Sequence, residues 1–137
     1  MKKIILSGLL AGVAMLAVGF GAGYGLMAIF PKLAAEYANT ALFRPWSDPI
    51  MSLYFAHPFA LGFILAWIWN KVKGVIGGAG WAARGARFGL AYWAVSIPGM
   101  IISYASFPLS LVMVVTWSVS ILLQALAAGL ILAAINR

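Results

Sequence analysis

The sequence predicts an all-α membrane protein: a four-helix bundle with a short interfacial helix in its first outer loop. The first observation is composition, because 65% of the 137 residues are hydrophobic and only 8% are charged, against roughly 25% charged in an average globular chain. The second is that the charges avoid four long apolar stretches. Each stretch reaches or nearly reaches the roughly 20 residues that a helix needs to cross a bilayer. These stretches cover residues 4–30, 50–70, 88–107 and 108–135.

The apolar stretches favour helices over strands. A transmembrane barrel would need segments of about 10 residues that alternate between polar and apolar, and an open sheet would leave backbone groups unpaired in hydrocarbon. The first stretch is also longer than the roughly 7–15 apolar residues of a secretory signal peptide. Because the four spans occupy almost the whole chain, we expect one transmembrane domain over residues 1–137.

The basic residues predict the orientation. Only Lys32 and Arg44 lie between the first and second spans, and the other basic residues flank the opposite ends of the spans. The side of a membrane protein that is richer in Lys and Arg is normally cytoplasmic. We therefore expect a multi-pass protein of the prokaryotic cell (inner) membrane with its N- and C-termini in the cytoplasm. The residues expected on that side are Lys2, Lys3, Lys71, Lys73, Arg84, Arg87 and Arg137.

The same cations indicate partners. Four of them, Lys71, Lys73, Arg84 and Arg87, are expected to meet the anionic headgroups of the lipid bilayer. A nucleic-acid partner is not expected despite the net charge of +7, since no basic stripe alternates with aromatic residues on a soluble surface. The other expected partners are further copies of the chain or other membrane subunits.

Two stripes of small residues predict close helix packing. Gly8, Gly12, Gly19 and Gly23 are spaced 4, 7 and 4 residues apart in the first span, which places them on one face of a helix. Small residues let helix backbones approach closely in lipid. A contact within the chain is the first interpretation, with contacts between copies and a ligand passage as alternatives. The fourth span carries a second stripe, which includes Ala125 and Gly129.

The loop between the first two spans predicts local structure of its own. Leu33, Tyr37 and Ala41 share one face of a helix, which predicts a short helix at the membrane interface. Ser47 or Asp48 can cap the second span, whose first turn would then contain a proline.

His57 is the only histidine, and ionisable residues at membrane depth usually mark function. One interpretation is structural: the imidazole bonds a hydroxyl of a neighbouring helix, from Ser103, Tyr104 or Ser106. The other is proton handling or ligand binding, with Tyr54, which precedes His57 by three residues and shares its face. Haem ligation is the least favoured role, because one histidine supplies one axial ligand.

No constellation for catalysis is present in the sequence. The only carboxylates, Glu36 and Asp48, lie 12 residues apart in the outer loop, and acid–base catalysis needs carboxylates held together in a cleft. The glycine-rich segment 71–87 lacks the Gly-Lys-Ser/Thr ending of a phosphate-binding loop. The chain contains no cysteine. We therefore expect no enzyme activity, no catalytic residue, no metal site and no cofactor.

Several runs resemble a group of short, uncharacterised, four-span prokaryotic membrane proteins: FRPWSDP, HPFALGFILAWIWNKVKG, RFGLAYW and SIPGMIISYASFPLSLVM. The resemblance implies four spans with both ends inside and supplies no activity or site residue. Small multidrug exporters are similar in size, but the glutamate that they need in the first span is absent here. Fluoride channels are also similar in size, yet their pore motifs have no counterpart.

Two functions follow from these observations. The leading interpretation is a non-enzymatic integral membrane protein that packs as a homo-oligomer or as an accessory subunit of a larger membrane complex. The alternative is a small oligomeric transporter or channel with a polar path near His57. That path would be lined by Tyr54, His57, Ser96, Ser103 and Gln124.

Overall fold

The computed structural model describes residues 2–137 and confirms the all-α class. Four long helices dominate it, and each is long and apolar enough to cross a membrane, so the chain is a multi-pass membrane protein. Two short elements lie between the first two of them: the helix α2 (Lys32–Tyr37) and a 3₁₀ turn, η1 (Pro49–Met51). The long helices are α1 (Lys2–Ile29), α3 (Ser52–Val72), α4 (Trp81–Ser106) and α5 (Leu111–Ile135).

Two helix boundaries differ from those expected. Helix α4 begins at Trp81 instead of residue 88, so Arg84 and Arg87 lie in its first two turns. Their charges lower the local hydropathy, so the apolar stretch read from the sequence begins later than the helix. The helix can still include them, because long basic side chains extend from a helix end toward the membrane interface. Helix α5 begins after Ser110, whose hydroxyl accepts a hydrogen bond from the Met113 N–H at 3.1 Å and caps the helix.

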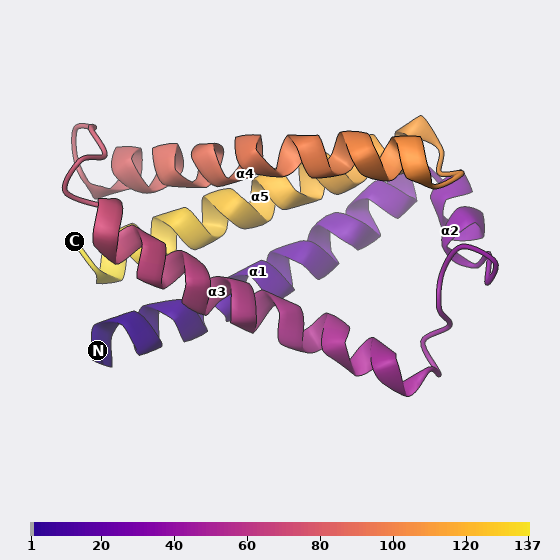
Figure 1. Ribbon diagram of the computed structural model, residues 1–137, viewed down its shortest axis with the longest axis horizontal. Helices are drawn as coiled ribbons and strands as arrows, with labels where there is room; N and C mark the ends of the chain where they lie inside the picture. The colour runs from indigo at the N-terminus through magenta and orange to yellow at the C-terminus, as the bar shows by residue number, and fades with distance from the viewer. Residues whose placement is uncertain (1) are drawn as a thin grey trace.

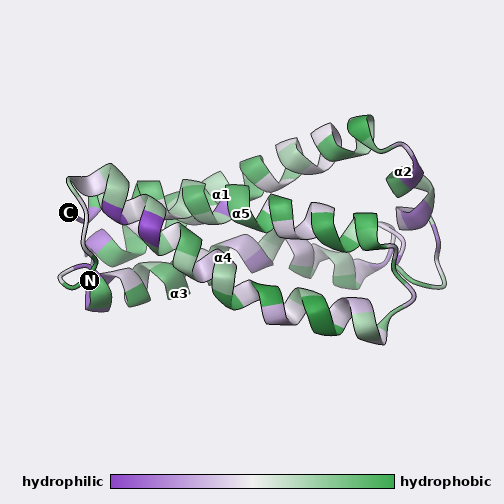
Figure 2. Ribbon diagram, turned by 90° about the horizontal axis from the view of Figure 1, so that it is seen from above, coloured by the Kyte–Doolittle hydropathy of each residue, from purple (hydrophilic) through white to green (hydrophobic). Residues whose placement is uncertain are grey.

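The two ends of the bundle differ (Figure 1). Both termini and the segment 73–80 lie at one end, which we call the terminal end. The loops 30–51 and 107–110 lie at the other, the loop end. Figure 2 shows hydrophobic residues along most of each long helix, whereas α2 at the loop end and the helix starts at the terminal end carry hydrophilic ones.

The long helices pack in the order α3–α1–α5–α4. Helices α1 and α3 cross one another, and α4 lies alongside α5 (Figure 1). In the part of the chain that the structure describes, α3 and α4 make no extended contact, and they approach mainly at the terminal end through Trp69 and Phe88, with ring centroids 5.3 Å apart. The bundle is therefore a chain of three packed pairs with one open side.

Glycines determine where α1 and α3 cross. Gly8 and Gly12 of α1 face Gly62 of α3, and a Cβ atom on Gly12 would lie 2.9 Å from the Cα of Phe59. No side chain fits in that space, so the two backbones touch. Gly19, the third glycine of the predicted stripe, instead lies against α5, where an added Cβ would be 3.2 Å from Cδ of Gln124.

The fourth glycine of the predicted stripe does not take part in this packing. Nothing lies within 4 Å of a Cβ added to Gly23, because the loop ends of α1 and α3 have already diverged beyond the crossing (Figure 1). The stripe therefore packs as far as Gly19, against α3 at Gly8 and Gly12 and against α5 at Gly19, and not at Gly23.

The contact between α4 and α5 uses the second predicted stripe. Gly85 and Gly89 of α4 lie against Ala125 and Gly129 of α5, and a Cβ added to Gly89 would be 2.5 Å from the Ala125 oxygen. Such close backbone approach lets dispersion contacts hold helices together where lipid offers no hydrophobic driving force. Near the middle of the same pair, the Trp93 indole N–H donates to the Ser118 carbonyl at 3.0 Å.

The core fills the half of the bundle next to the terminal end. Its buried residues come from all four long helices: Ala11, Met15, Leu65, Ala66, Trp69, Phe88, Ala128, Leu132 and Ala133. Trp69 is completely buried, and its indole N–H donates to the Asn136 main-chain oxygen at 2.9 Å. The Lys73 ammonium group also donates to Asn136, at 3.2 Å to its side-chain oxygen. These bonds fasten the end of α3 to the end of α5.

At the loop end, α2 fastens the outer loop to α5. The Glu36 carboxylate accepts hydrogen bonds from the Ser110 N–H at 2.8 Å and from its hydroxyl at 2.6 Å. A carboxylate at this position also complements the positive end of the α5 helix dipole. The Trp117 indole N–H donates to the Tyr37 hydroxyl at 2.6 Å. The expected short helix is thus present, with Leu33 buried beneath it, but it ends at Tyr37, so Ala41 lies outside it.

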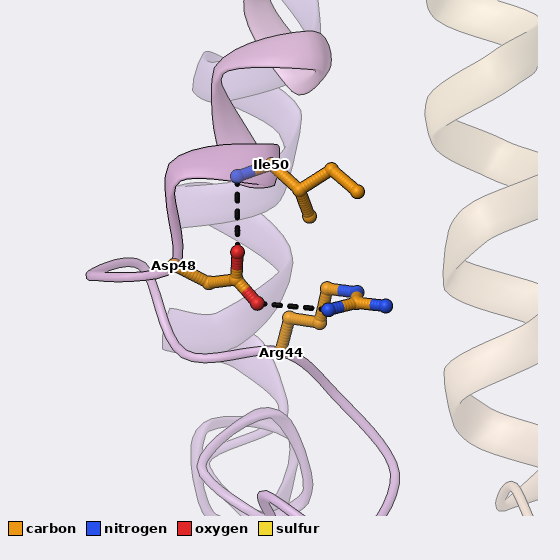
Figure 3. Close-up of polar contacts among 3 residues, drawn as sticks. All are labelled: Arg44, Asp48 and Ile50. Carbon is orange, nitrogen blue, oxygen red and sulfur yellow. Dashed lines mark hydrogen bonds and ion pairs between the residues drawn. The ribbon is translucent and has the colours of Figure 1, made fainter.

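Asp48 caps the start of the second span (Figure 3). One carboxylate oxygen accepts from the Ile50 N–H at 3.0 Å, and the other accepts from the Arg44 guanidinium at 2.8 Å. Pro49 follows in the first turn, where its missing N–H leaves no donor unpaired. The Ile50 N–H and, second, the Arg44 guanidinium lower the pKa of the Asp48 carboxyl below its ordinary 3.8.

A first prediction concerns this pKa. The folded pKa is depressed, so the cap and ion pair stabilise the loop above the unfolded pKa, and this contribution is lost as the pH falls through the folded value. Replacing Arg44 with glutamine removes one cause and leaves the Ile50 bond. We expect carbon NMR to show the Asp48 pKa rising in Arg44→Gln but staying below 3.8. An unchanged pKa in the variant would mean that the ion pair does not form in solution.

A second prediction compares two glycines of the same helix. Gly12→Ala pushes a methyl group into the Phe59 backbone, and overpacking of this kind typically costs about 1–3 kcal/mol. Gly23→Ala enters open space, so it should cost nothing and can gain up to about 1 kcal/mol of helix propensity. Thermal unfolding in detergent measures both. Equal effects of the two changes would contradict the assigned crossing.

Candidate functional site

A cleft of ≈ 440 Å³ opens among the four long helices in the half of the bundle next to the loop end. Each long helix contributes to its wall. The lining residues are Met15, Leu16 and Gly19 of α1; Tyr54, His57, Pro58 and Leu61 of α3; Tyr92, Ser96, Gly99 and Met100 of α4; and Ile121 and Gln124 of α5.

The cleft reaches about the middle of the spans. Ser96 lies ten residues before the last residue of α4, which is about 15 Å along a helix. That distance is about half of the roughly 30 Å hydrocarbon core of a bilayer. Beyond this depth the core around Trp69 fills the bundle. The cleft is therefore closed toward the terminal end and does not cross the molecule.

Helical spacing brings the polar groups of the cleft together. Tyr54 and His57 lie three residues apart on α3, and Tyr92 and Ser96 lie four apart on α4, so each pair shares one helix face. Gln124 adds an amide from α5. Residues far apart in the sequence thus present hydroxyl, imidazole and amide groups to one space.

His57 lines the cleft and is exposed within the chain. Among residues 2–137, no side chain or backbone group forms a hydrogen bond with its imidazole. The expected bond to a hydroxyl near the end of α4 is therefore absent. Ser103 instead donates to the Gly99 carbonyl of its own helix at 2.7 Å, a local bond that serine often forms within helices.

The other polar groups keep part of their hydrogen-bonding capacity. The Ser96 hydroxyl donates to the Trp93 carbonyl at 2.6 Å, which leaves its oxygen free to accept. The Gln124 amide nitrogen donates to the Ser120 hydroxyl at 3.1 Å, which leaves one N–H and the carbonyl oxygen of that amide. A molecule in the cleft would therefore meet donors and acceptors on three sides.

The floor and the rim of the cleft come from different helices. Met15, on the floor, is 2% exposed, whereas Tyr54 is 47% exposed at the rim. At the loop end, Tyr54 packs edge-on against Trp46 at 5.3 Å and against Phe20 at 5.9 Å.

The charges of the protein lie outside the cleft. Glu36 and Asp48 are engaged with Ser110 and with Arg44, and neither lines the space. The residues expected to meet anionic headgroups are all at the terminal end, where Lys71 and Arg87 are exposed and Lys73 bonds to Asn136.

The structure brings some of the predicted site residues together and leaves one of them outside the cleft. Of the residues proposed to handle a ligand or proton, Tyr54, His57 and Gln124 line the cleft, as does Ser96, whereas Ser103 does not. Tyr92 and Gly99 were missed, although their spacing of 92, 96 and 99 places them on the same face of α4 as Ser96. Within the described residues, no group of three or more His, Cys, Asp or Glu residues could hold a metal ion.

Comparison of the chain with protein-family models, with curated proteins and with solved structures found no match.

Proposed function

We propose that the protein is a non-enzymatic membrane protein that binds a small ligand in this cleft, as the binding step of a small transporter. The observation that carries the proposal is the convergence of Tyr54, His57, Ser96 and Gln124 on one space at membrane depth. An ionisable or strongly polar side chain is costly there and usually serves a substrate pathway. The His57 imidazole, which has no hydrogen-bond partner among the described residues, supports a ligand site most clearly.

A carrier fits the cleft better than an open channel. The bundle is packed from the middle of the spans to the terminal end, so a continuous pore would have to form elsewhere, for example between copies. A transport cycle would require the packed half to open. The hydrogen bonds of Trp69 and Lys73 to Asn136 are the contacts that such an opening would break.

Assembly with other copies or with a larger membrane complex is the second candidate function. It is favoured by the open side between α3 and α4, which a neighbouring subunit could cover. Under either function we propose that the terminal end lies in the cytoplasm of a prokaryotic cell, where Lys71 and Arg87 contact anionic headgroups. The cleft then lies in the outer half of the inner membrane.

A third prediction tests access to the cleft with single cysteines, since the natural chain has none. Thiols react as thiolates, which require water around them. Ser96→Cys places a thiol in the cleft. Val95→Cys places a thiol in the lipid instead, because Val95 is 77% exposed on the outside of α4. With a charged methanethiosulfonate added outside intact cells, Ser96→Cys should react at least about tenfold faster because its thiol can ionise.

Two results would overturn the proposal. Equally slow modification of both cysteines would mean that the cleft is closed to water and offers no binding site. Modification of Ser96→Cys only when the reagent is added from the cytoplasmic side would reverse the proposed orientation.

A further inference from the structure

The cleft opens sideways, between the two helices that do not pack against each other. The three packed pairs, α3–α1, α1–α5 and α5–α4, close it on the other sides. Its exposed lining residues, Tyr54, His57 and Gly99, all belong to α3 and α4. A membrane-spanning bundle faces hydrocarbon on its sides, so this opening leads into the lipid, and a molecule dissolved in the bilayer can reach the cleft without crossing the loop end.

The lining is mainly apolar. Five of the thirteen lining residues carry long aliphatic or thioether side chains, and the polar groups occupy a smaller part of the wall. A hydrated ion would lose its water here without gaining a full set of ligands, which is strongly unfavourable. A hydrocarbon chain suits this wall, with a volume in the range of ordinary ligand sites. The five residues are Met15, Leu16, Leu61, Met100 and Ile121.

The polar groups select the head of such a molecule. Tyr54, His57, Tyr92 and Gln124 can all donate hydrogen bonds, and no carboxylate lines the cleft. A cationic head would therefore remain without a counter-charge at membrane depth, which is costly. A carboxyl, carboxylate or ester head instead accepts hydrogen bonds from these donors.

We propose that the ligand is a single-chain amphiphile with an uncharged or anionic, oxygen-bearing head, of which a fatty acid is the simplest example. Its head lies among Tyr54, His57 and Gln124, and its chain lies along the apolar wall and extends out between α3 and α4. The proposal rests on the proposed function, because it names the ligand of the same cleft. Binding of such an amphiphile requires both a polar, hydrated interior of the cleft and an opening from the cleft into the lipid.

The test measures protection of Ser96→Cys in phosphatidylcholine nanodiscs against uncharged N-ethylmaleimide. The probes are dodecanoate, butyrate and dodecylammonium, which separate the contributions of chain and head. Saturating dodecanoate should slow the reaction at least about fivefold, because the reactive fraction falls as 1/(1 + [L]/Kd). Butyrate and dodecylammonium should not slow it. A reference cysteine, Ser47→Cys in the exposed outer loop, should be unaffected, which controls for changes at the lipid surface.

Two glycines provide a matched pair for the opening. Nothing lies within 4 Å of a Cβ added to Gly99 or to Gly25, but only Gly99 lines the cleft. In the Ser96→Cys background, Gly99→Phe should obstruct the opening and reduce protection by dodecanoate, and Gly25→Phe should leave it unchanged. His57→Leu should raise the dodecanoate concentration that gives half-maximal protection, as a second variant that does not depend on the opening.

Each contrary outcome has one meaning. Equal protection by butyrate would show that the ligand is a small solute without a chain, and equal protection by dodecylammonium would show that the head is not selected. Either result, or no protection by dodecanoate, overturns the inference. The proposed function would survive these results, because it fails if Ser96→Cys reacts no faster than Val95→Cys in the absence of any probe.

Discussion

Close backbone contact at two helix pairs is the constraint on which the rest of the structure depends. Gly62 against Gly8 and Gly12 fixes the crossing of α1 and α3, and Gly85 and Gly89 against Gly129 fix the α4–α5 pair. Contacts of this kind occur only where both helices carry very small residues. They lie toward the terminal end, and beyond them α3 diverges from α1 while α4 stays alongside α5 (Figure 1). The divergence produces the cleft.

The two ends of the bundle are held by different means. Near the termini, a packed core and the bonds of Trp69 and Lys73 to Asn136 join the last turns of α3 and α5. At the loop end, hydrogen bonds from α5 to Glu36 and Tyr37 hold α2 in place. The contacts at the loop end join α2 to α5, and they do not hold the start of α3 against α5. This asymmetry keeps polar residues of α3 facing the cleft instead of a neighbouring helix.

The fold class could be predicted from the sequence because the thickness of the bilayer requires about 20 apolar residues in each spanning helix. The sequence predicted the packing role of Gly12 and Gly129 from their spacing, because both belong to stripes on a single helix. It could not predict Gly62, which is an isolated glycine whose partner lies on another helix, nor the divergence that removes Gly23 from the contact. Likewise, Tyr54 and His57 were predicted to act together from their shared face, while their proximity to Gln124 requires the tertiary arrangement.

The most direct test of this account is oxidative cross-linking of cysteine pairs in the naturally cysteine-free chain. A Cβ on Gly85 would lie 2.9 Å from the Cβ of Ala133, which is shorter than the roughly 3.5–4.5 Å spacing of disulfides, so α4 and α5 must separate by about 1 Å to accept the bond. Because this separation is small, Gly85→Cys with Ala133→Cys should form a disulfide between α4 and α5. His57→Cys with Ser96→Cys, across the cleft between α3 and α4, should form none and should be joined only by a longer bifunctional maleimide. Equally rapid disulfide formation by both pairs would show that α3 and α4 pack together, and it would contradict the open side and the cleft.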